Sequence, residues 1–138
     1  MTTKAEVNYQ YFEDALFEKR VWMPSANVSN YLLVFAAPFL GSADKFGRRA
    51  FKDLIITLSE SEIVPRTIVF WNRAVLACLD RSPLLEALAK IERNGVRILV
   101  SAFAIEKLKA KSRLRIGKLA NYLDFLEVIH KSQKVVTF

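Results

Sequence analysis

From Tyr31 onward, the chain alternates short apolar runs with amphipathic stretches. A short continuous apolar run is typical of a strand that is buried on both faces, whereas apolar residues three and four apart indicate a helix. Strands connected through helices imply right-handed crossovers and a mostly parallel sheet covered on both sides. The pattern therefore predicts an α/β domain with four strands over 31–37, 67–71, 96–100 and 135–138, and helices over 46–58, 84–91 and 119–129.

Local signals support this division of the chain. Ser42 and Asp44 are each a suitable cap for the first helix, and Ser82-Pro83 is a typical helix start. Residues 1–30 do not follow the alternation, although they contain five aromatic residues. We expect them to form an arm that packs on its own domain or on a neighbouring subunit, and we assign residues 31–138 to the α/β domain.

Composition bounds the class of protein. With 138 residues, 52% of them hydrophobic and 25% charged, the chain fits one folded domain and is not of the disordered class. Its longest apolar run, Tyr31 to Leu40, is much shorter than the roughly 20 residues of a membrane span. The first 20 residues are polar and mixed in charge, unlike a signal peptide, so we expect a cytoplasmic protein.

The residue types that commonly carry metal or nucleophilic chemistry are scarce. One cysteine and one histidine exclude a disulfide framework or a cysteine-rich zinc site within one chain, and we predict no metal and no cofactor. Cys78 lies in an apolar stretch, which predicts a buried and unreactive thiol. His130 falls at a predicted helix end, where an imidazolium complements the helix dipole.

The net charge of +7 is concentrated in one segment. Residues 105–118 contain six basic residues and one acidic residue, which accounts for +5 of the total. From Lys107 to Ile116 basic and apolar side chains mostly alternate, and a period of two predicts an extended segment with one basic face. Two interpretations remain open: an edge that maintains solubility, or a groove for phosphate or an acidic partner.

Ligands of open parallel sheets bind beyond the carboxyl ends of the strands. In this sequence the polar residues that follow those ends are Ser42, Asn72, Arg73 and Ser101, and the basic segment follows the third strand. Several positive groups thus meet without a cluster of carboxylates. This combination favours the binding of an anion over general acid–base chemistry.

Residues spread over the domain carry a family resemblance: Leu40-Gly41, Phe46-Gly47, Pro65, Asn72, Gly95 to Leu99, Ile116-Gly117, Asn121 and Lys134 to Phe138. In their order and spacing the chain resembles the DsrE/DsrF-like family, most of all the C-terminal domain of YedF-like proteins. The resemblance implies a flavodoxin-like three-layer domain with a mostly parallel sheet of four to five strands. It also implies trimers or hexamers, a sulfur-carrier protein partner, and a persulfide on a cysteine in the loop after the third strand.

This sequence departs from the family at that cysteine. Ser101 and Ala104 stand at the cysteine positions, and neither side chain can form a persulfide. Cys78 follows the second strand and does not replace them. The leading hypothesis is therefore a non-catalytic DsrE-like protein, in a setting of sulfur relay or selenium metabolism, that binds an anionic ligand or a protein partner. The expected ligand-binding residues are Ser42, Asn72, Arg73, Ser101, Ala104, Lys107 and Lys109.

Two alternatives remain open. One is a small-molecule enzyme that uses Ser101, Asn72 and Arg73, although no His, Asp or Glu stands near them in the sequence to activate a hydroxyl. The other is nucleic-acid binding through residues 105–118. We rank this last because aromatic side chains for base stacking are not interleaved with the basic ones. Membrane binding is not expected.

Overall fold

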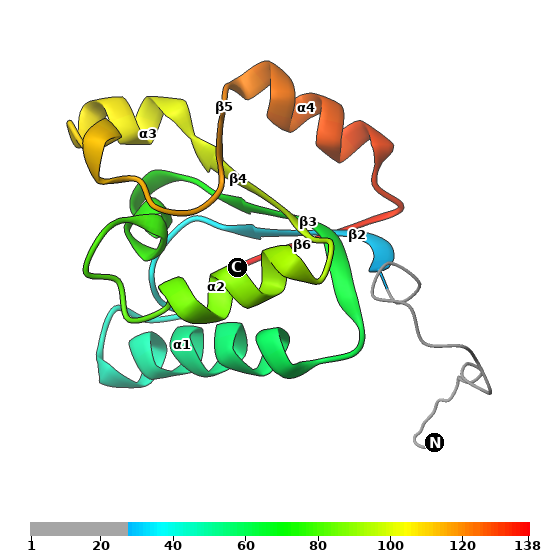
Figure 1. Cartoon of the computed structure of the whole chain (residues 1–138), viewed down its shortest axis with the longest axis horizontal. Coiled ribbons are helices and arrows are strands. Elements are labelled where there is room, and N and C mark those ends of the chain that lie inside the picture. Colours follow the sequence, from blue (N-terminus) through cyan, green and yellow to red (C-terminus); the bar gives the residue numbers. More distant parts are fainter. Residues whose placement is uncertain (1–27) are drawn as a thin grey trace.

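The computed structural model describes residues 28–138, which form a five-stranded, entirely parallel sheet (Figure 1). The strand order is β5-β4-β3-β2-β6. Continuous apolar runs suit this arrangement because a parallel sheet is covered on both faces. The strands are β2 (Val28–Phe35), β3 (Val64–Phe70), β4 (Arg97–Ser101), β5 (Lys118–Ala120) and β6 (Lys134–Thr137).

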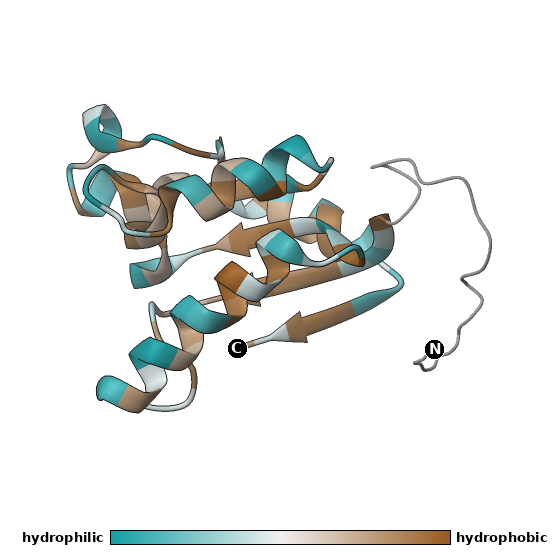
Figure 2. Cartoon of the chain, turned by 60° about the horizontal axis from the view of Figure 1, so that its bottom comes forward, coloured by the Kyte–Doolittle hydropathy of each residue, from teal (hydrophilic) through white to brown (hydrophobic). Residues whose placement is uncertain are grey.

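Helices lie on both sides of the sheet, so the domain has three layers. The pair α1 and α2 covers one face and α4 covers the other (Figure 1). In Figure 2 the strands are mostly hydrophobic, whereas the helices carry both hydrophobic and hydrophilic residues. The helices are α1 (Lys45–Glu60), η2 (Asn72–Cys78), α2 (Leu85–Arg93), α3 (Ala102–Lys107), η3 (Lys111–Arg113) and α4 (Tyr122–Lys131).

Two hydrophobic clusters hold the layers together. The larger one fills the space between the sheet and α1, α2 and η2, and contains stacked rings of Phe35 and Phe70. The smaller one lies beneath α4, where Phe125 and Val128 pack on sheet residues such as Leu32 and Val34. Burial of this apolar surface is the main source of the fold's stability.

The four predicted strands are present, and each of their ends is shifted by one to three residues. The predicted start of α1 is also confirmed. Asp44 accepts a hydrogen bond from the Gly47 N–H at 3.1 Å, and the Ser42 hydroxyl donates to the same carboxylate at 2.7 Å. These bonds lower the pKa of Asp44, the Gly47 bond most of all, because they favour the ionised form.

Two predictions between β4 and α4 are wrong. The segment 107–116 is not extended: Lys107 ends α3, residues 111–113 form a 3-10 turn, and Lys109 has a left-handed backbone with φ +52°. The helix predicted over 119–129 begins at Tyr122, because Asn121 caps it in a box with Asp124. Leu119 belongs instead to β5, a strand of three residues that was not predicted.

The arm predicted over residues 1–30 lies almost entirely outside the described residues. Within residues 28–138, none of the helices combines the length and the apolar character needed to cross a membrane. The same part of the chain holds no group of three His, Cys, Asp or Glu side chains arranged to bind a metal ion.

Candidate functional site

The predicted site residues that follow β2 and β3 are exposed at the carboxyl edge of the sheet. Ser42 lies in the loop before α1, where its hydroxyl is bound to Asp44. Asn72 and Arg73 open η2, and Asn72 has a positive φ of 51°. The structure does not bring these three residues into one cavity. The loop after β2 instead borders a separate hollow of about 180 Å³, between α1 and η2, that Arg48 and Lys52 help to line.

Ser101 and Ala104, which the family resemblance places at cysteine positions, are both buried. Ser101 is 2% exposed and Ala104 is 5% exposed. The Ser101 hydroxyl caps α3 by accepting a hydrogen bond from the Ala104 N–H at 3.2 Å. This contact explains a serine at the end of β4 without any ligand, because a helix N-terminus needs such an acceptor.

The basic segment folds back onto η2 rather than running free. Leu79 and Leu114 form an antiparallel bridge, and the Arg115 N–H donates to the Cys78 carbonyl at 2.9 Å. Arg113 donates to the Asp80 carboxylate at 2.8 Å, which lowers the pKa of Asp80. These contacts hold the segment in place, and the Arg113 guanidinium is already bound to Asp80. The lysines of the segment are therefore the side chains available to a ligand.

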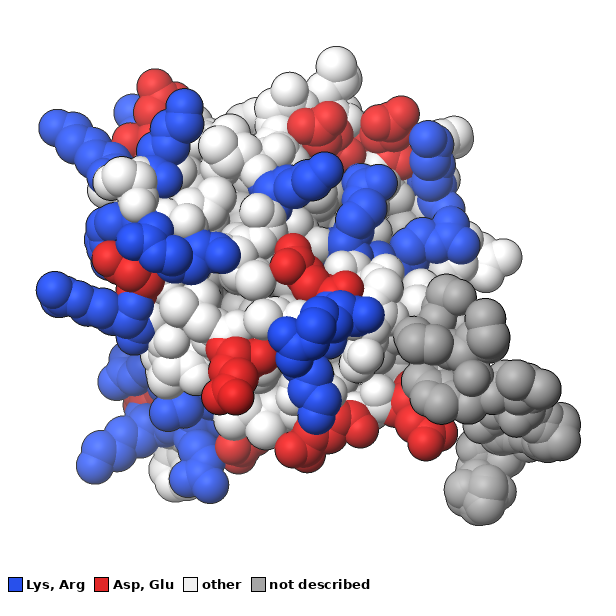
Figure 3. All heavy atoms as spheres, in the orientation of Figure 1, with Lys and Arg blue, Asp and Glu red and all other residues white. Residues whose placement is uncertain are grey.

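A groove of about 640 Å³ lies between α3 and this segment. Lys109 and Lys111 line it together with Ser112, and Glu106 supplies one carboxylate. Of the predicted ligand-binding residues, only Lys109 lines the groove; Lys107 lies nearby, with its ammonium 5.6 Å from the Phe103 ring centre. Figure 3 shows many Lys and Arg side chains on the left of the molecule, where Figure 1 places α3 and the loops after the strands.

Lys111 and Ser112 line the groove but are not among the predicted ligand-binding residues. Both belong to the basic segment 105–118, so the sequence does show one charged and one polar side chain there. Their placement depends on the turn at Lys109 and on the bridge to η2, which join parts of the chain more than 30 residues apart. No local pattern reports such a contact.

Apolar side chains border the groove and continue along α4. Leu119 lines the groove at 41% exposure. The exposed rings of Phe103, at the start of α3, and Tyr122, at the start of α4, lie 6.1 Å apart. On α4, Leu123 and Leu126 are 74% and 63% exposed. The helical stripe predicted through Leu119, Tyr122, Leu123, Leu126 and Ile129 is therefore not the core face; Phe125 and Val128 are the residues that face the sheet. Exposed apolar surface of this extent is typical of protein contacts.

Cys78 is completely buried on the inner side of η2, as predicted. Burial raises the pKa of its thiol, because the thiolate loses its hydration, and the charge of Glu92 adds to the effect. A thiol in this state is a poor nucleophile. The structure therefore offers no exposed sulfur among residues 28–138.

The parallel sheet, its three layers and the loops at its carboxyl edge define an α/β protein of the flavodoxin-like class, with a DsrE-like fold. The crystal structure of the YchN protein from E. coli has this fold and matches the chain with a TM-score of 0.62. The match covers 80% of this chain and 100% of the YchN chain at 17% sequence identity, a level at which the likeness establishes the fold alone. No protein-family model and no curated protein matches the chain.

Proposed function

We propose that this protein is a non-catalytic DsrE-like binding protein that takes an acidic protein partner in the groove between α3 and the basic segment. The observation that carries the proposal is the combination of Lys109 and Lys111 with the exposed Leu119 in one groove. A charged rim around apolar side chains is the usual anatomy of a protein interface.

The chemistry of the same edge supports binding over catalysis. A hydroxyl nucleophile needs an adjacent base, and the Ser101 hydroxyl is buried and already bound to a backbone N–H. Cys78 lies on the buried side of η2, and the pKa of its thiol is raised. The alternative of an enzyme built on Ser101, Asn72 and Arg73 thus lacks an accessible nucleophile among them.

Charge favours a partner other than a second copy in this groove. The chain carries a net +7; Lys109 and Lys111 line the groove, and Lys107 and Lys118, which are close to groove residues in the sequence, are exposed as well. Two such surfaces would repel each other, whereas an acidic surface would be attracted over about a Debye length. The family resemblance implies a sulfur-carrier protein as the partner, and trimers or hexamers of this chain; both belong to the proposal.

The binding test uses a fluorescent peptide that combines glutamates with leucines, followed by anisotropy on the full chain. Lys109→Gln with Lys111→Gln should weaken binding by about tenfold, whereas Lys45→Gln with Lys90→Gln, which removes the same charge elsewhere, should change it less than about twofold. Leu119→Ser should weaken binding of the peptide but not binding of a single-stranded oligonucleotide of equal charge. Equal losses in the two double variants, or tighter binding of the oligonucleotide, would overturn the proposal.

A separate measurement tests the absence of sulfur transfer. A ³⁵S-labelled persulfide donor is incubated with the wild-type chain and with Cys78→Ala, which contains no cysteine. We expect no label on either protein. Label that appears on the wild type and disappears in the variant would show that Cys78 carries persulfide sulfur, and the non-catalytic part of the proposal would be wrong.

A further inference from the structure

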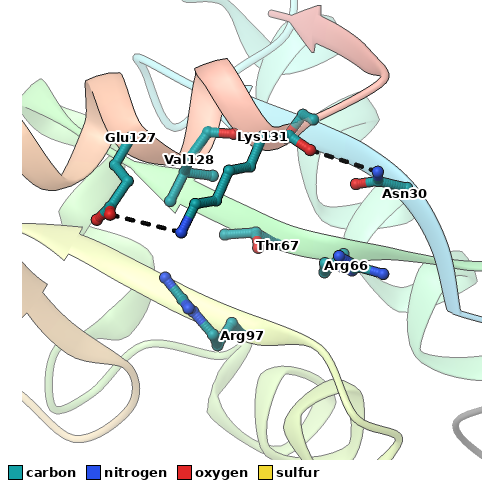
Figure 4. A pocket seen from close by; sticks show the side chains of 8 residues that line it. Asn30, Arg66, Thr67, Arg97, Glu127, Val128 and Lys131 are labelled. Carbon is teal, nitrogen blue, oxygen red and sulfur yellow. Dashed lines mark hydrogen bonds and ion pairs between the residues drawn. The ribbon is translucent and has the colours of Figure 1, made fainter.

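A second polar cavity lies at the opposite edge of the sheet, where the strands begin. It has a volume of about 130 Å³ and is enclosed by β2, β3, β4 and the C-terminal end of α4. Figure 4 shows its lining. Two cationic side chains reach it from different elements, Arg97 from β4 and Lys131 from α4 (Figure 4). Arg66 also borders the cavity, but it precedes Thr67 on β3, so its side chain points to the other face of the sheet. Neither Arg97 nor Lys131 was a candidate in the sequence, because they belong to elements that are distant along the chain.

The backbone around the cavity is held in place. Thr67 and Arg97 are register partners on neighbouring strands, so their positions are set by the β3–β4 ladder. The Asn30 side-chain amide donates to the Lys131 carbonyl at 3.3 Å, which ties the end of α4 to β2. In Figure 4 the Arg97 side chain extends from β4 toward α4, and the Lys131 side chain extends from α4 toward the sheet.

The charges around the cavity do not balance. Glu127 is the one carboxylate in its lining, and it lies 3.5 Å from the Lys131 ammonium. Within residues 28–138, Arg97 forms no ion pair. Arg97 and Lys131 against one carboxylate leave an excess of +1, which favours the entry of an anion.

We propose that this cavity is a binding site for a small oxyanion of the size of phosphate. A guanidinium presents planar, paired N–H donors that match the oxygens of phosphate, and the Lys131 ammonium and the Thr67 hydroxyl add further donors. The volume is sufficient for one tetrahedral anion with a little water.

One feature of the cavity opposes an anion, and it is weaker than the cations. The carbonyl end of a helix carries a partial negative charge, and α4 ends here. Two of the carbonyls near that end already accept hydrogen bonds. The Lys131 carbonyl accepts one from the Asn30 side-chain amide, and the Val128 carbonyl accepts one from the Ser132 hydroxyl at 2.7 Å. A fraction of one negative charge therefore faces a net excess of one positive charge.

The test measures binding of inorganic phosphate to the full chain by titration calorimetry at constant ionic strength, with chloride as the balancing anion. Arg97→Gln should weaken phosphate binding by about tenfold, the loss of one charge-assisted hydrogen bond. The control Arg93→Gln removes an equal, exposed charge at the end of α2 and should change binding less than about twofold. Glu127→Gln should tighten binding several-fold, because it removes the one opposing carboxylate.

The outcomes separate a built site from diffuse attraction. Unsaturable binding, equal losses in Arg97→Gln and Arg93→Gln, or no gain in Glu127→Gln would each overturn the proposal. Thermal unfolding of every variant verifies that the fold is intact. A parallel titration with phosphoserine distinguishes the two sources of the same chemistry: tighter binding than inorganic phosphate assigns the site to a phosphate monoester, and weaker binding assigns it to the free anion.

Discussion

Gly47, the third residue of α1, packs directly against the backbone of the loop that follows β2. A Cβ built at this position would meet the Ser42 carbonyl carbon at 2.7 Å and the Leu40 carbonyl oxygen at 2.8 Å, and it would lie closer still to the Ser42 carbonyl oxygen. All three atoms are backbone, so relief requires the loop itself to move. The same loop is fixed by the bond from the Leu40 N–H to the Gly47 carbonyl at 2.9 Å.

Gly47→Ala should therefore destabilise the protein, against the usual effect of this substitution. Alanine in place of glycine inside a helix normally stabilises by about 1 kcal/mol. Here the displaced loop would lose the Asp44 cap, which contributes about 1 kcal/mol, and the Leu40–Gly47 hydrogen bond, which contributes about 1 kcal/mol. Overpacking adds about 1–3 kcal/mol. The free energy of unfolding should fall by about 2 kcal/mol or more after the helix gain is subtracted.

Urea unfolding followed by circular dichroism gives this free energy directly. Thr57→Ala, at an exposed position in the same helix, is the matched control and should stabilise by about 0.5 kcal/mol through helix propensity alone. If Gly47→Ala is as stable as the wild type, or gains as much as Thr57→Ala, then the loop does not rest on the start of α1 and the reasoning fails.

Three further predictions concern a buried thiol, a mostly buried tyrosine and a helix cap. The Cys78 thiol should react with a thiol reagent only slowly in the folded chain and promptly in urea, since it is the one cysteine and is fully buried; prompt reaction of the native protein would contradict its burial. Burial raises the pKa of Tyr31 to about 12, so the folded state resists ionisation of this side chain. The free energy of unfolding should therefore fall by about 2–3 kcal/mol as pH rises from about 10 to about 12. Urea unfolding of Tyr31→Phe at these two pH values should show a smaller fall, and an equal fall would assign the effect to other groups. Asn121→Ala removes half of the capping box of α4 and should cost about 1 kcal/mol, measured by thermal unfolding, and a neutral result would mean that the box does not stabilise the helix.

The strands were predictable because their residues have one requirement, burial on both faces. Leu32 to Phe35 are all nearly or completely buried, and a continuous apolar run is the only pattern compatible with that. The face of a helix is less certain. In α1, Ile55 and Leu58 face the core as their spacing indicates, but Phe46 is 85% exposed, and Phe51, five residues later in the same helix, is buried instead.

The exposed stripe of α4 illustrates the limit of periodicity. Spacing identifies residues that share a helix face, but α4 is apolar on more than one face, so spacing does not decide which face meets the sheet. Phe125 and Val128 pack on the sheet, whereas Leu123 and Leu126 remain in contact with solvent.

The candidate sites depended still more on long-range contacts. The alternation in the basic segment separates buried from exposed side chains only in part: Ala110 is fully buried and Lys109 and Lys111 are exposed, but Ser112 is exposed too. Its geometry comes from a left-handed residue and from pairing with η2, which a local pattern does not encode. The cavity around Arg97 likewise exists only once β2, β3, β4 and α4 have met.

The position of β2 in the sheet has a consequence for the order in which the domain assembles. Its two neighbours are β3, which follows after one helix, and β6, whose Lys134 pairs with Tyr31 across about a hundred intervening residues. Contacts between residues so distant in sequence form slowly, because a long loop must close first. During synthesis, one edge of β2 therefore stays open until all the other strands have been made, and this edge is the part of the nascent chain most in need of protection from misplaced pairing.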